Sequence, residues 1–240
     1  MFKTPNVIIP VRLDSSRLPA KAMLRLTSDN TVIEHCIARC LEFGLSPVVA
    51  TDRNSFQHLK YLSAKFDICV EWGPKNNKLK RLVQTAVTLK MPVFHIVDPD
   101  DPFFCPTRVM KSLSMVKTGL AIFPSVYSDQ GGATEGYSFM TEDLLAVLAT
   151  PDNLDTSMIQ PHITFLEKNV IENPSFATKQ TRLTLDYIED YFYFLDLFGT
   201  FDHRTNREEL ELFILKNNMF GNVFLNHLWK QKQLSEMKND

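Results

Sequence analysis

The sequence lacks three features, and each absence excludes a class of protein. Its 240 residues carry a formal net charge of −2, so they offer no basic field of the kind that binds nucleic acid. No apolar run approaches the roughly 20 residues that a membrane-spanning helix requires. The N-terminal stretch MFKTPNVIIPV has neither the apolar core nor the cleavage site of a signal peptide. We therefore expect a cytoplasmic protein that binds neither nucleic acid nor membranes.

Cysteine is also scarce, with four residues in the chain. Cys36 and Cys40 have the i,i+4 spacing that half of a metal site would also have, but no second cluster of ligands follows. We interpret them as buried thiols on an apolar helix face. With 44% apolar and 22% charged residues, a chain of this length can bury a core without disulfides. The composition predicts one domain over residues 1–240.

The first half of the chain alternates between strand and helix patterns. Short β-branched runs predict buried strands, and runs with apolar residues at helical spacing predict the helices between them. Thr31 and Glu34 have the spacing of a capping box. The alternation predicts an α/β fold with a mostly parallel, Rossmann-like sheet, in which ligands bind beyond the carboxyl ends of the strands. Strands are expected at 6–11, 46–52, 68–72, 92–98 and 119–126, and helices at 31–44, 54–66, 77–90 and 107–116.

Residues 127–180 interrupt this rhythm with a glycine pair and several prolines, and they predict an accessory segment. Its apolar residues have no obvious core of their own, so we expect them to form the interface of a homodimer. They include Phe139, Ile159, Ile163 and Phe165. After this segment, TRLTLD (181–186) predicts another strand, and a long helix follows it.

The loop after the first strand, PVRLDSSRLPAK (10–21), concentrates cations and hydroxyls. Guanidinium groups bind phosphate oxygens in pairs, an ammonium adds a mobile charge, and the amides of a tight turn add donors. The pattern favours a triphosphate site, although a solvated surface loop is the simpler alternative. The GxxxxGK[ST] pattern of a Walker A loop is absent. The residues concerned are Arg12, Ser15, Ser16, Arg17 and Lys21.

Acids are concentrated in VDPDDPF (97–103), at the expected end of the fourth strand. Carboxylate oxygens at a strand end suit Mg²⁺, with phosphates and waters completing its octahedron. Asp98 and Asp100 also form a D-x-D pattern. A lone strand-end aspartate, such as Asp52, can instead cap the next helix or form a turn.

IPVRLDSSRLPAK (9–21) resembles the signature IPAR-x-x-S-x-RLPGK of the cytidylyltransferase family, which includes the synthetases of CMP-activated 3-deoxy-manno-octulosonate and CMP-sialic acid. VATD (49–52) and RLTLDYIED (182–190) resemble later segments of this family. ATEGYSFMTEDLLAVL (133–148) and PHITFLEKNVIENPSF (161–176) are closest to its spore-coat polysaccharide branch. The resemblance covers about residues 6–195.

This resemblance implies a nucleotidyltransferase that transfers CMP from CTP to a small acidic, sugar-like or phosphorylated acceptor and releases pyrophosphate. Mg²⁺ would bind Asp100 and Asp186, with Asp98 as the alternative ligand. Two facing carboxylates repel unless a cation lies between them, so we expect the metal-free protein to tolerate the loss of either charge. The implied nucleotide-binding residues are Arg12, Ser15, Ser16, Arg17, Lys21, Asp52 and Arg81, with Lys21, Arg17 and Asp100 as the catalytic group, and the implied acceptor-binding residues are Glu135 and His162.

The sequence departs from the family pattern at three places. Ala20 stands where the loop usually has glycine, and Pro99 replaces the glycine before the metal aspartate. Residues 76–78, Asn-Asn-Lys, stand in a segment that is usually acidic, which predicts a more positive rim. Two alternatives therefore stay open: a D-x-D glycosyltransferase that uses a nucleotide sugar, and a non-catalytic nucleotide-binding protein descended from the family.

Overall fold

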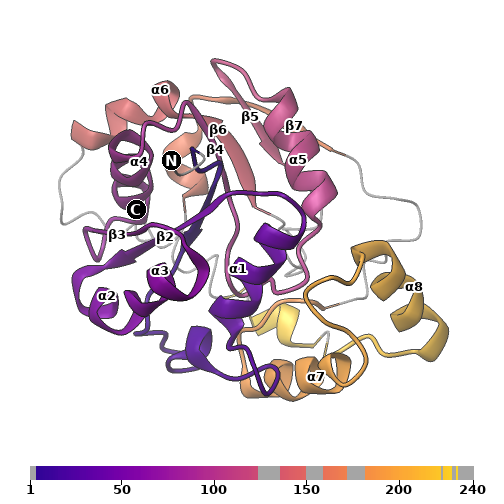
Figure 1. The fold of residues 1–240 in the computed structure, drawn as a ribbon. Coiled ribbons are helices and arrows are strands. Elements are labelled where there is room, and N and C mark those ends of the chain that lie inside the picture. Colours follow the sequence, from indigo (N-terminus) through magenta and orange to yellow (C-terminus); the bar gives the residue numbers. More distant parts are fainter. Residues whose placement is uncertain are drawn as a thin grey trace.

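The computed structural model describes residues 4–123, 136–149, 159–171, 182–222, 224–228 and 231 (Figure 1). None of the helices in these ranges is long and apolar enough to cross a membrane. In chain order the elements are β1 (Val7–Pro10), η1 (Lys21–Met23), α1 (Val32–Glu42), β2 (Pro47–Asp52), α2 (Arg53–Leu59), α3 (Tyr61–Phe66), β3 (Val70–Gly73), α4 (Lys78–Thr88), β4 (Val93–Ile96), α5 (Pro106–Met115), β5 (Leu120–Phe123), β6 (Tyr137–Met140), α6 (Thr141–Leu144), η3 (Leu145–Ala149), η4 (Gln160–Ile163), β7 (Glu167–Val170), α7 (Ile188–Phe198) and α8 (Arg207–Asn217).

The strands form one sheet of seven, in the order β3-β2-β1-β4-β6-β5-β7. Strands β1 to β4 are parallel to one another, and β7 is parallel to β5. Among the described strands, β6 alone runs antiparallel to its neighbours, β4 and β5. The mostly parallel α/β fold expected from the sequence is therefore confirmed. β6 and β7 belong to the expected accessory segment, and they extend the central sheet.

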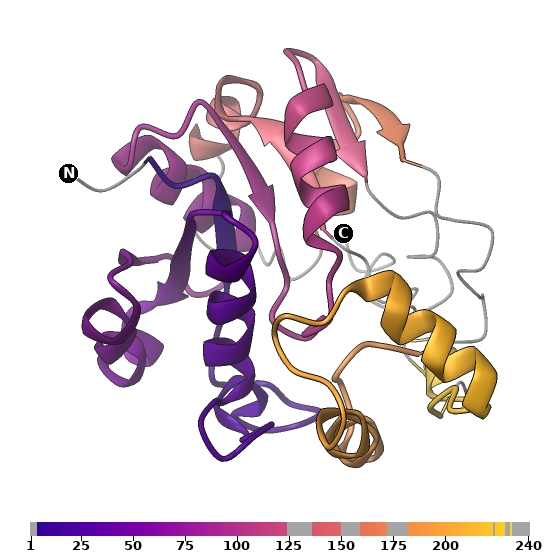
Figure 2. The same cartoon turned by 45° about the vertical axis from the view of Figure 1, so that its right-hand side comes forward.

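The two faces of the sheet are covered by different helices (Figures 1 and 2). Val7 and Ile9 of β1 pack in a cluster with residues of α1 and α5, whereas Ile8, between them, packs against α4. This alternation follows from the two-residue period of a strand. A third cluster joins α7 and α8 to Val32 and Phe103, beyond the carboxyl end of β4. The sheet thus carries a helical layer on each face and a helical pair at one end.

The helix start expected at Thr31 is present in the structure. The hydroxyl of Thr31 accepts from the Glu34 amide, and the Glu34 carboxylate accepts from the Thr31 amide, which is the expected capping box. Cys36 and Cys40 are free thiols, both fully buried on α1. The helix expected at 54–66 is divided into α2 and α3 at Lys60.

The apolar residues of the accessory segment are mostly covered by the chain itself. Phe139, Ile159 and Ile163 lie in the core cluster beneath α4, and all three are at most 2% exposed. Phe165, with 58% of its surface exposed, is the one of the four expected interface residues that remains open. Burial of the other three needs no second copy, so this argument for a homodimer is weaker than the sequence implied.

Candidate active site

The loop after β1 is closed on itself and anchored to β2. The Ala20 amide donates to the Leu13 carbonyl at 3.2 Å, and the Leu13 amide donates to the hydroxyl of Ser55 at 3.1 Å. Ser55 in turn donates to Asp52 at 2.6 Å. Ala20 adopts φ 52° and ψ 28°, the left-handed conformation that glycine enters at little cost. Ala20 therefore adopts a backbone conformation that is strained for a residue with a side chain.

Asp52 supports this loop from inside the protein. It is 2% exposed and caps α2, accepting from the amides of Asn54 and Ser55. Burial opposes its ionisation, but the hydrogen bonds from Ser55 and Asn54 outweigh burial and lower the pKa of Asp52 below its ordinary 3.8. Its carboxylate is occupied by these contacts. In this structure Asp52 is the N-cap of α2, which is the alternative role that the sequence allowed.

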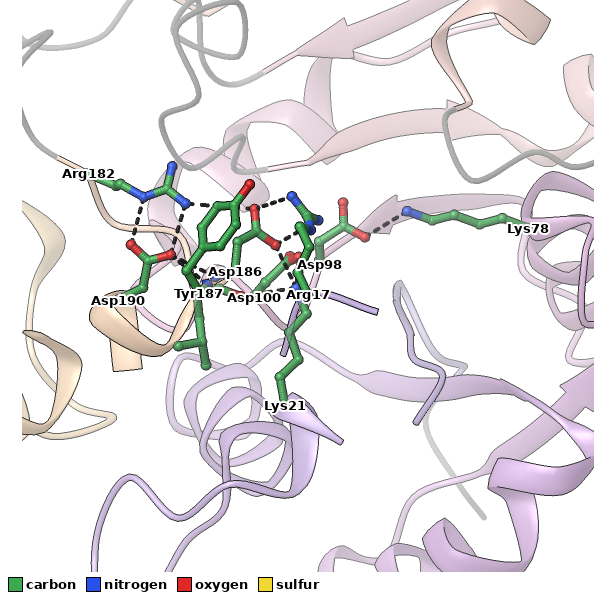
Figure 3. A network of polar contacts seen from close by, with 10 residues as sticks. Arg17, Lys21, Lys78, Asp98, Asp100, Arg182, Asp186, Tyr187 and Asp190 are labelled. Carbon is green, nitrogen blue, oxygen red and sulfur yellow. Dashed lines mark hydrogen bonds and ion pairs between the residues drawn. The ribbon is translucent and has the colours of Figure 1, made fainter. Parts of the chain in front are cut away.

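Lys21 lies at the centre of the site (Figure 3). Its ammonium donates to Asp100 Oδ2 at 2.7 Å, to Asp186 Oδ1 at 2.8 Å and to the Leu185 carbonyl at 3.0 Å, which uses all three of its protons. Burial disfavours the charged ammonium, but the two carboxylates outweigh burial and raise the pKa of Lys21. Burial likewise acts against the ionised form of Asp100, and Lys21 reverses this effect and lowers the pKa of Asp100.

Arg17 also pairs with Asp186. Its Nη2 lies 2.8 Å from Asp186 Oδ1 and its Nη1 lies 3.1 Å from Asp186 Oδ2, a two-point pairing of planar groups. The guanidinium also lies 5.7 Å from the centre of the Tyr187 ring. The Asp186 side chain is only 2% exposed, whereas Arg17 is 22% exposed. The expected repulsion between Asp100 and Asp186 is therefore absent, because Lys21 is the cation between them.

Asp98 faces a different cation. Its Oδ1 lies 2.8 Å from the ammonium of Lys78, the first residue of α4 (Figure 3). Asn77, fully buried, caps that helix by accepting from the Lys80 amide at 2.8 Å. Lys75 pairs with Asp14 at 2.8 Å. Lys78 and the nearby Lys75 thus each have a counter-ion within the chain, which offsets the positive charge that the sequence predicted for this rim.

The segment that carries Asp186 is not a strand, although the sequence predicted one. Within the described part of the chain, residues 182–186 form no strand. The Leu185 amide instead donates to the backbone carbonyl of Asp100 at 2.7 Å, which ties this segment to the turn after β4. Asp100 and Asp186 meet through this link and through Lys21.

Two arginines of the predicted site, Arg12 and Arg81, contact a different segment of the chain. Arg12 donates to the Lys75 carbonyl at 3.0 Å, and buried Arg81 donates to the carbonyls of Pro74 and Lys75 at 2.6 and 3.2 Å. They therefore hold the turn between β3 and α4 rather than Asp100 or Asp186. Burial and the neighbouring charge of Arg12 lower the pKa of Arg81 to about 10.

In the loop between these two groups, Ser15 is half-buried and Ser16 is exposed. The predicted nucleotide-binding residues thus lie at or after the carboxyl ends of β1, β2 and β3.

The two expected acceptor-binding residues are Glu135 and His162. Glu135 lies outside the described residues. His162 is half-buried and lies on η4 beside Ile163, which packs in the core beneath α4. Three residues to which the sequence gave no separate role also belong to the network of Figure 3: Arg182, Tyr187 and Asp190. The acid in the first turn of α7 was a capping signal that could have identified Asp190.

Comparison with known proteins gives a family and a set of similar folds. A model of the cytidylyltransferase family matches residues 6–219. No curated protein matches the sequence. A cytidylyltransferase from Leptospira borgpetersenii serovar Hardjo-bovis superimposes with a TM-score of 0.77 at 18% identity, covering 91% of this chain and 97% of the other.

Two further structures have the same fold at greater distance. CMP:2-keto-3-deoxy-manno-octonic acid synthetase, complexed with CTP, gives a TM-score of 0.57 at 15% identity, covering 82% of this chain and 99% of the other. The 2-C-methyl-D-erythritol 4-phosphate cytidylyltransferase of Thermus thermophilus gives 0.56 at 14% identity, covering 82% of this chain and 100% of the other. At these identities the likeness establishes the fold.

Proposed function

The chain belongs to the cytidylyltransferase family, as its sequence predicted, and from this membership we propose that it transfers CMP from CTP to a small acceptor with release of pyrophosphate. The acceptor oxygen attacks the α-phosphate in line, and the bond to the β-phosphate breaks. Such transfers depend on positioning and on charge neutralisation more than on covalent chemistry by the protein. The residues that would supply both are Arg17, Lys21, Asp100 and Asp186.

One observation carries this proposal. Asp100 Oδ2 and Asp186 Oδ1 lie 2.7 and 2.8 Å from a single cation, the ammonium of Lys21, beside a second cation, Arg17. Two anionic oxygens that converge on one cation position are suited to a divalent metal, and hard carboxylate oxygens are the ligands that Mg²⁺ prefers. When bound, Mg²⁺ would neutralise charge that develops on the phosphates. Asp100 and Asp186 are the residues that would hold it.

The cations of the loop have a defined role in this scheme. Lys21 and Arg17 would leave their carboxylate partners for the β- and γ-phosphates, so that the triphosphate takes over the charge of these side chains. Arg12, 31% exposed at the edge of the loop, would contact the α-phosphate. In the described residues no group of three or more His, Cys, Asp and Glu side chains could hold a metal. A metal on two carboxylates would therefore take its remaining ligands from phosphate and water.

The D-x-D alternative finds less support in this geometry. Asp98 and Asp100 do not converge on one cation, since Asp98 pairs with Lys78 while Asp100 pairs with Lys21. We keep Asp98 as an alternative ligand only for a state in which Lys78 has moved. The acceptor is proposed to be acidic, sugar-like or phosphorylated, and assignment to the spore-coat branch and to a homodimer stays a prediction. A non-catalytic nucleotide-binding protein would also bind CTP, so only a measurement of turnover distinguishes that alternative from this proposal.

A thermal-shift comparison of the four nucleoside triphosphates with Mg²⁺ tests the nucleotide. CTP is expected to raise the melting temperature most, because residues 9–21 resemble the cytidylyltransferase signature. A ligand at 100 times its Kd adds about 2.7 kcal/mol of stability, which a melt can detect. Equal shifts for all four would remove the cytidine assignment. Pyrophosphate release from CTP with a panel of acceptors, followed by product mass spectrometry, tests the reaction. CTP binding without turnover of any acceptor would favour the non-catalytic protein.

A further inference from the structure

The position of Asp186 is not secured by the sheet. Among the described residues, its segment forms no strand, and one backbone hydrogen bond, from the Leu185 amide to the Asp100 carbonyl, joins it to the turn after β4. The Lys21 ammonium also donates to the Leu185 carbonyl, but neither bond holds the amides of Asp186 and Tyr187. Asp186 nevertheless makes a two-point pairing with Arg17 and a 2.8 Å contact with Lys21. Some other group must therefore hold the backbone around Asp186.

Asp190, in the first turn of α7, supplies that support (Figure 3). Its Oδ2 accepts from the amide of Asp186 and from the amide of Tyr187, each at 2.9 Å. The Asp190 side chain is 2% exposed, so water does not compete for these bonds. One carboxylate oxygen thus fixes two consecutive peptide groups around Asp186. Because both acceptor bonds involve an ionised group, they are stronger than bonds between neutral groups.

Arg182 links Asp190 to Asp186. Its Nε and Nη2 lie 2.7 and 2.9 Å from the two carboxylate oxygens of Asp190, and its Nη1 donates to Asn226 at 2.6 Å. The same Nη2 lies 3.8 Å from Asp186 Oδ2. The Arg182 side chain has no exposed surface, so its charge cannot turn to solvent. If Asp190 lost its charge, Arg182 would be drawn toward the Asp186 carboxylate.

We propose that Asp190 is a positioning residue, which directs the Asp186 carboxylate toward Lys21 and holds the Arg182 guanidinium away from it. This role rests on the proposed function, since it concerns how Asp186 is kept ready for a metal and a triphosphate. Asp190 touches neither ligand in this scheme. It acts through two backbone amides and through the partner that it gives to Arg182.

Mn²⁺ titration in saturating CTP, followed by electron paramagnetic resonance, tests the role without turnover. Asp190→Asn keeps an oxygen acceptor for the two amides but releases Arg182, so the Mn²⁺ concentration at half-saturation is expected to rise at least ten-fold. Asp196→Asn is the matched control, because Asp196 is exposed on the same helix, and it is expected to change this concentration less than two-fold. Adding Arg182→Gln to Asp190→Asn removes the released charge and should recover at least three-fold.

Folding is checked by circular dichroism. Asp190→Glu keeps the charge that buried Arg182 requires, and it serves where Asp190→Asn does not fold. Its longer side chain displaces the oxygen that holds the two amides, so a rise of at least three-fold is expected. A folded variant, Asn or Glu, with wild-type Mn²⁺ affinity would overturn the positioning role and leave the proposed function intact. A wild-type chain that does not bind Mn²⁺ with CTP would overturn the proposed function, and the positioning role with it.

Discussion

Asp100 and Asp101 are neighbours in the sequence but belong to different regions of the molecule. Asp100 is 28% exposed and contacts Lys21 in the candidate site, beside Asp186. Asp101 is 5% exposed and lies 3.6 Å from Arg207, which pairs with Glu211 on α8 at 2.7 Å. The turn in which the Asp101 amide donates to the Asp98 carbonyl sends the two side chains to opposite partners. One acid faces the site, and the other holds α8 to the turn.

The comparison teaches that buried charge has two uses here. In the candidate site Arg17, Lys21 and Asp100 are partly exposed, and the charged groups pair with one another when no ligand is bound. In the interior around Asp101, Arg39 is fully buried and donates to the carbonyls of Phe104, His203 and Thr205, contacts that join α1 to the segment before α8. Charged side chains of the candidate site can exchange a protein partner for a ligand, whereas those buried around Asp101 cannot. Variants in the two regions should therefore separate activity from stability.

The largest contrast is expected between aspartate variants. Asp100→Asn and Asp186→Asn should each lower CTP turnover by at least about 10²-fold, because the site loses an anionic metal ligand and a partner of Lys21. Both should also lower the melting temperature of the metal-free protein, contrary to the expectation from repulsion alone, because Lys21 loses a counter-ion. Asp101→Asn should retain turnover per folded molecule and cost about 3 kcal/mol of unfolding free energy. Equal effects of Asp100→Asn and Asp101→Asn on turnover would remove the distinction.

Acid should destabilise the interior region through His35. Burial, with the charge of Arg39, lowers the pKa of His35 from 6.5 to about 3, so the folded protein keeps this ring neutral while the unfolded chain takes up a proton below pH 6.5. Stability is therefore present above pH 6.5 and falls as the pH decreases toward 3. At pH 5 the loss is about 2 kcal/mol. Denaturant melts at pH 7.5 and pH 5 should differ less for His35→Gln, and an unchanged difference would contradict this assignment.

The candidate site should bind metal poorly without nucleotide, because Lys21 is already between the two carboxylates. Lys21→Met removes that cation and should raise the affinity for Mn²⁺ alone about ten-fold, or about 1.4 kcal/mol. Lys75→Met is the matched control, since it removes one positive charge from the ion pair with Asp14, outside the Lys21 contacts. Calorimetric titration measures both. Equal Mn²⁺ affinities for the wild-type chain and Lys21→Met would show that Lys21 does not compete with the metal.

The smallest expected effect concerns the backbone of the loop. Ala20→Gly should stabilise the protein by about 1 kcal/mol, because glycine adopts a φ of 52° without the strain of a side chain. Lys90→Gly is a control at nearly the same φ, 53°, outside the site. Both variants should raise the urea midpoint of unfolding slightly. Only Ala20→Gly should change the rise in melting temperature that CTP causes. A lower midpoint for Ala20→Gly would mean that the methyl group makes compensating contacts.

Local sequence was sufficient for the elements that depend on near neighbours. The Thr31–Glu34 capping box, the buried β1 strand and the α/β alternation rest on contacts within a few residues or on the two-residue period of a strand. Arg17 and Lys21 are four residues apart, so the sequence alone predicted that they lie in the same loop. The bond from Asp52 to its own helix start is equally local. Such features need no knowledge of what packs against them.

Long-range packing decided the pairing of charges in the site. Lys21 meets Asp186 across 165 residues of sequence, and Lys78 takes Asp98 across 20, which no local pattern specifies. Residues 182–186 have the alternation of a strand, yet they form none. The amide of Arg182 donates to the Phe220 carbonyl, that of Leu185 to the Asp100 carbonyl and that of Asp186 to Asp190. The burial of Phe139 within the chain depended likewise on β6 entering the sheet next to β4. The sequence determines which side chains carry charge. Which carboxylate each cation pairs with depends on how distant segments of the chain pack.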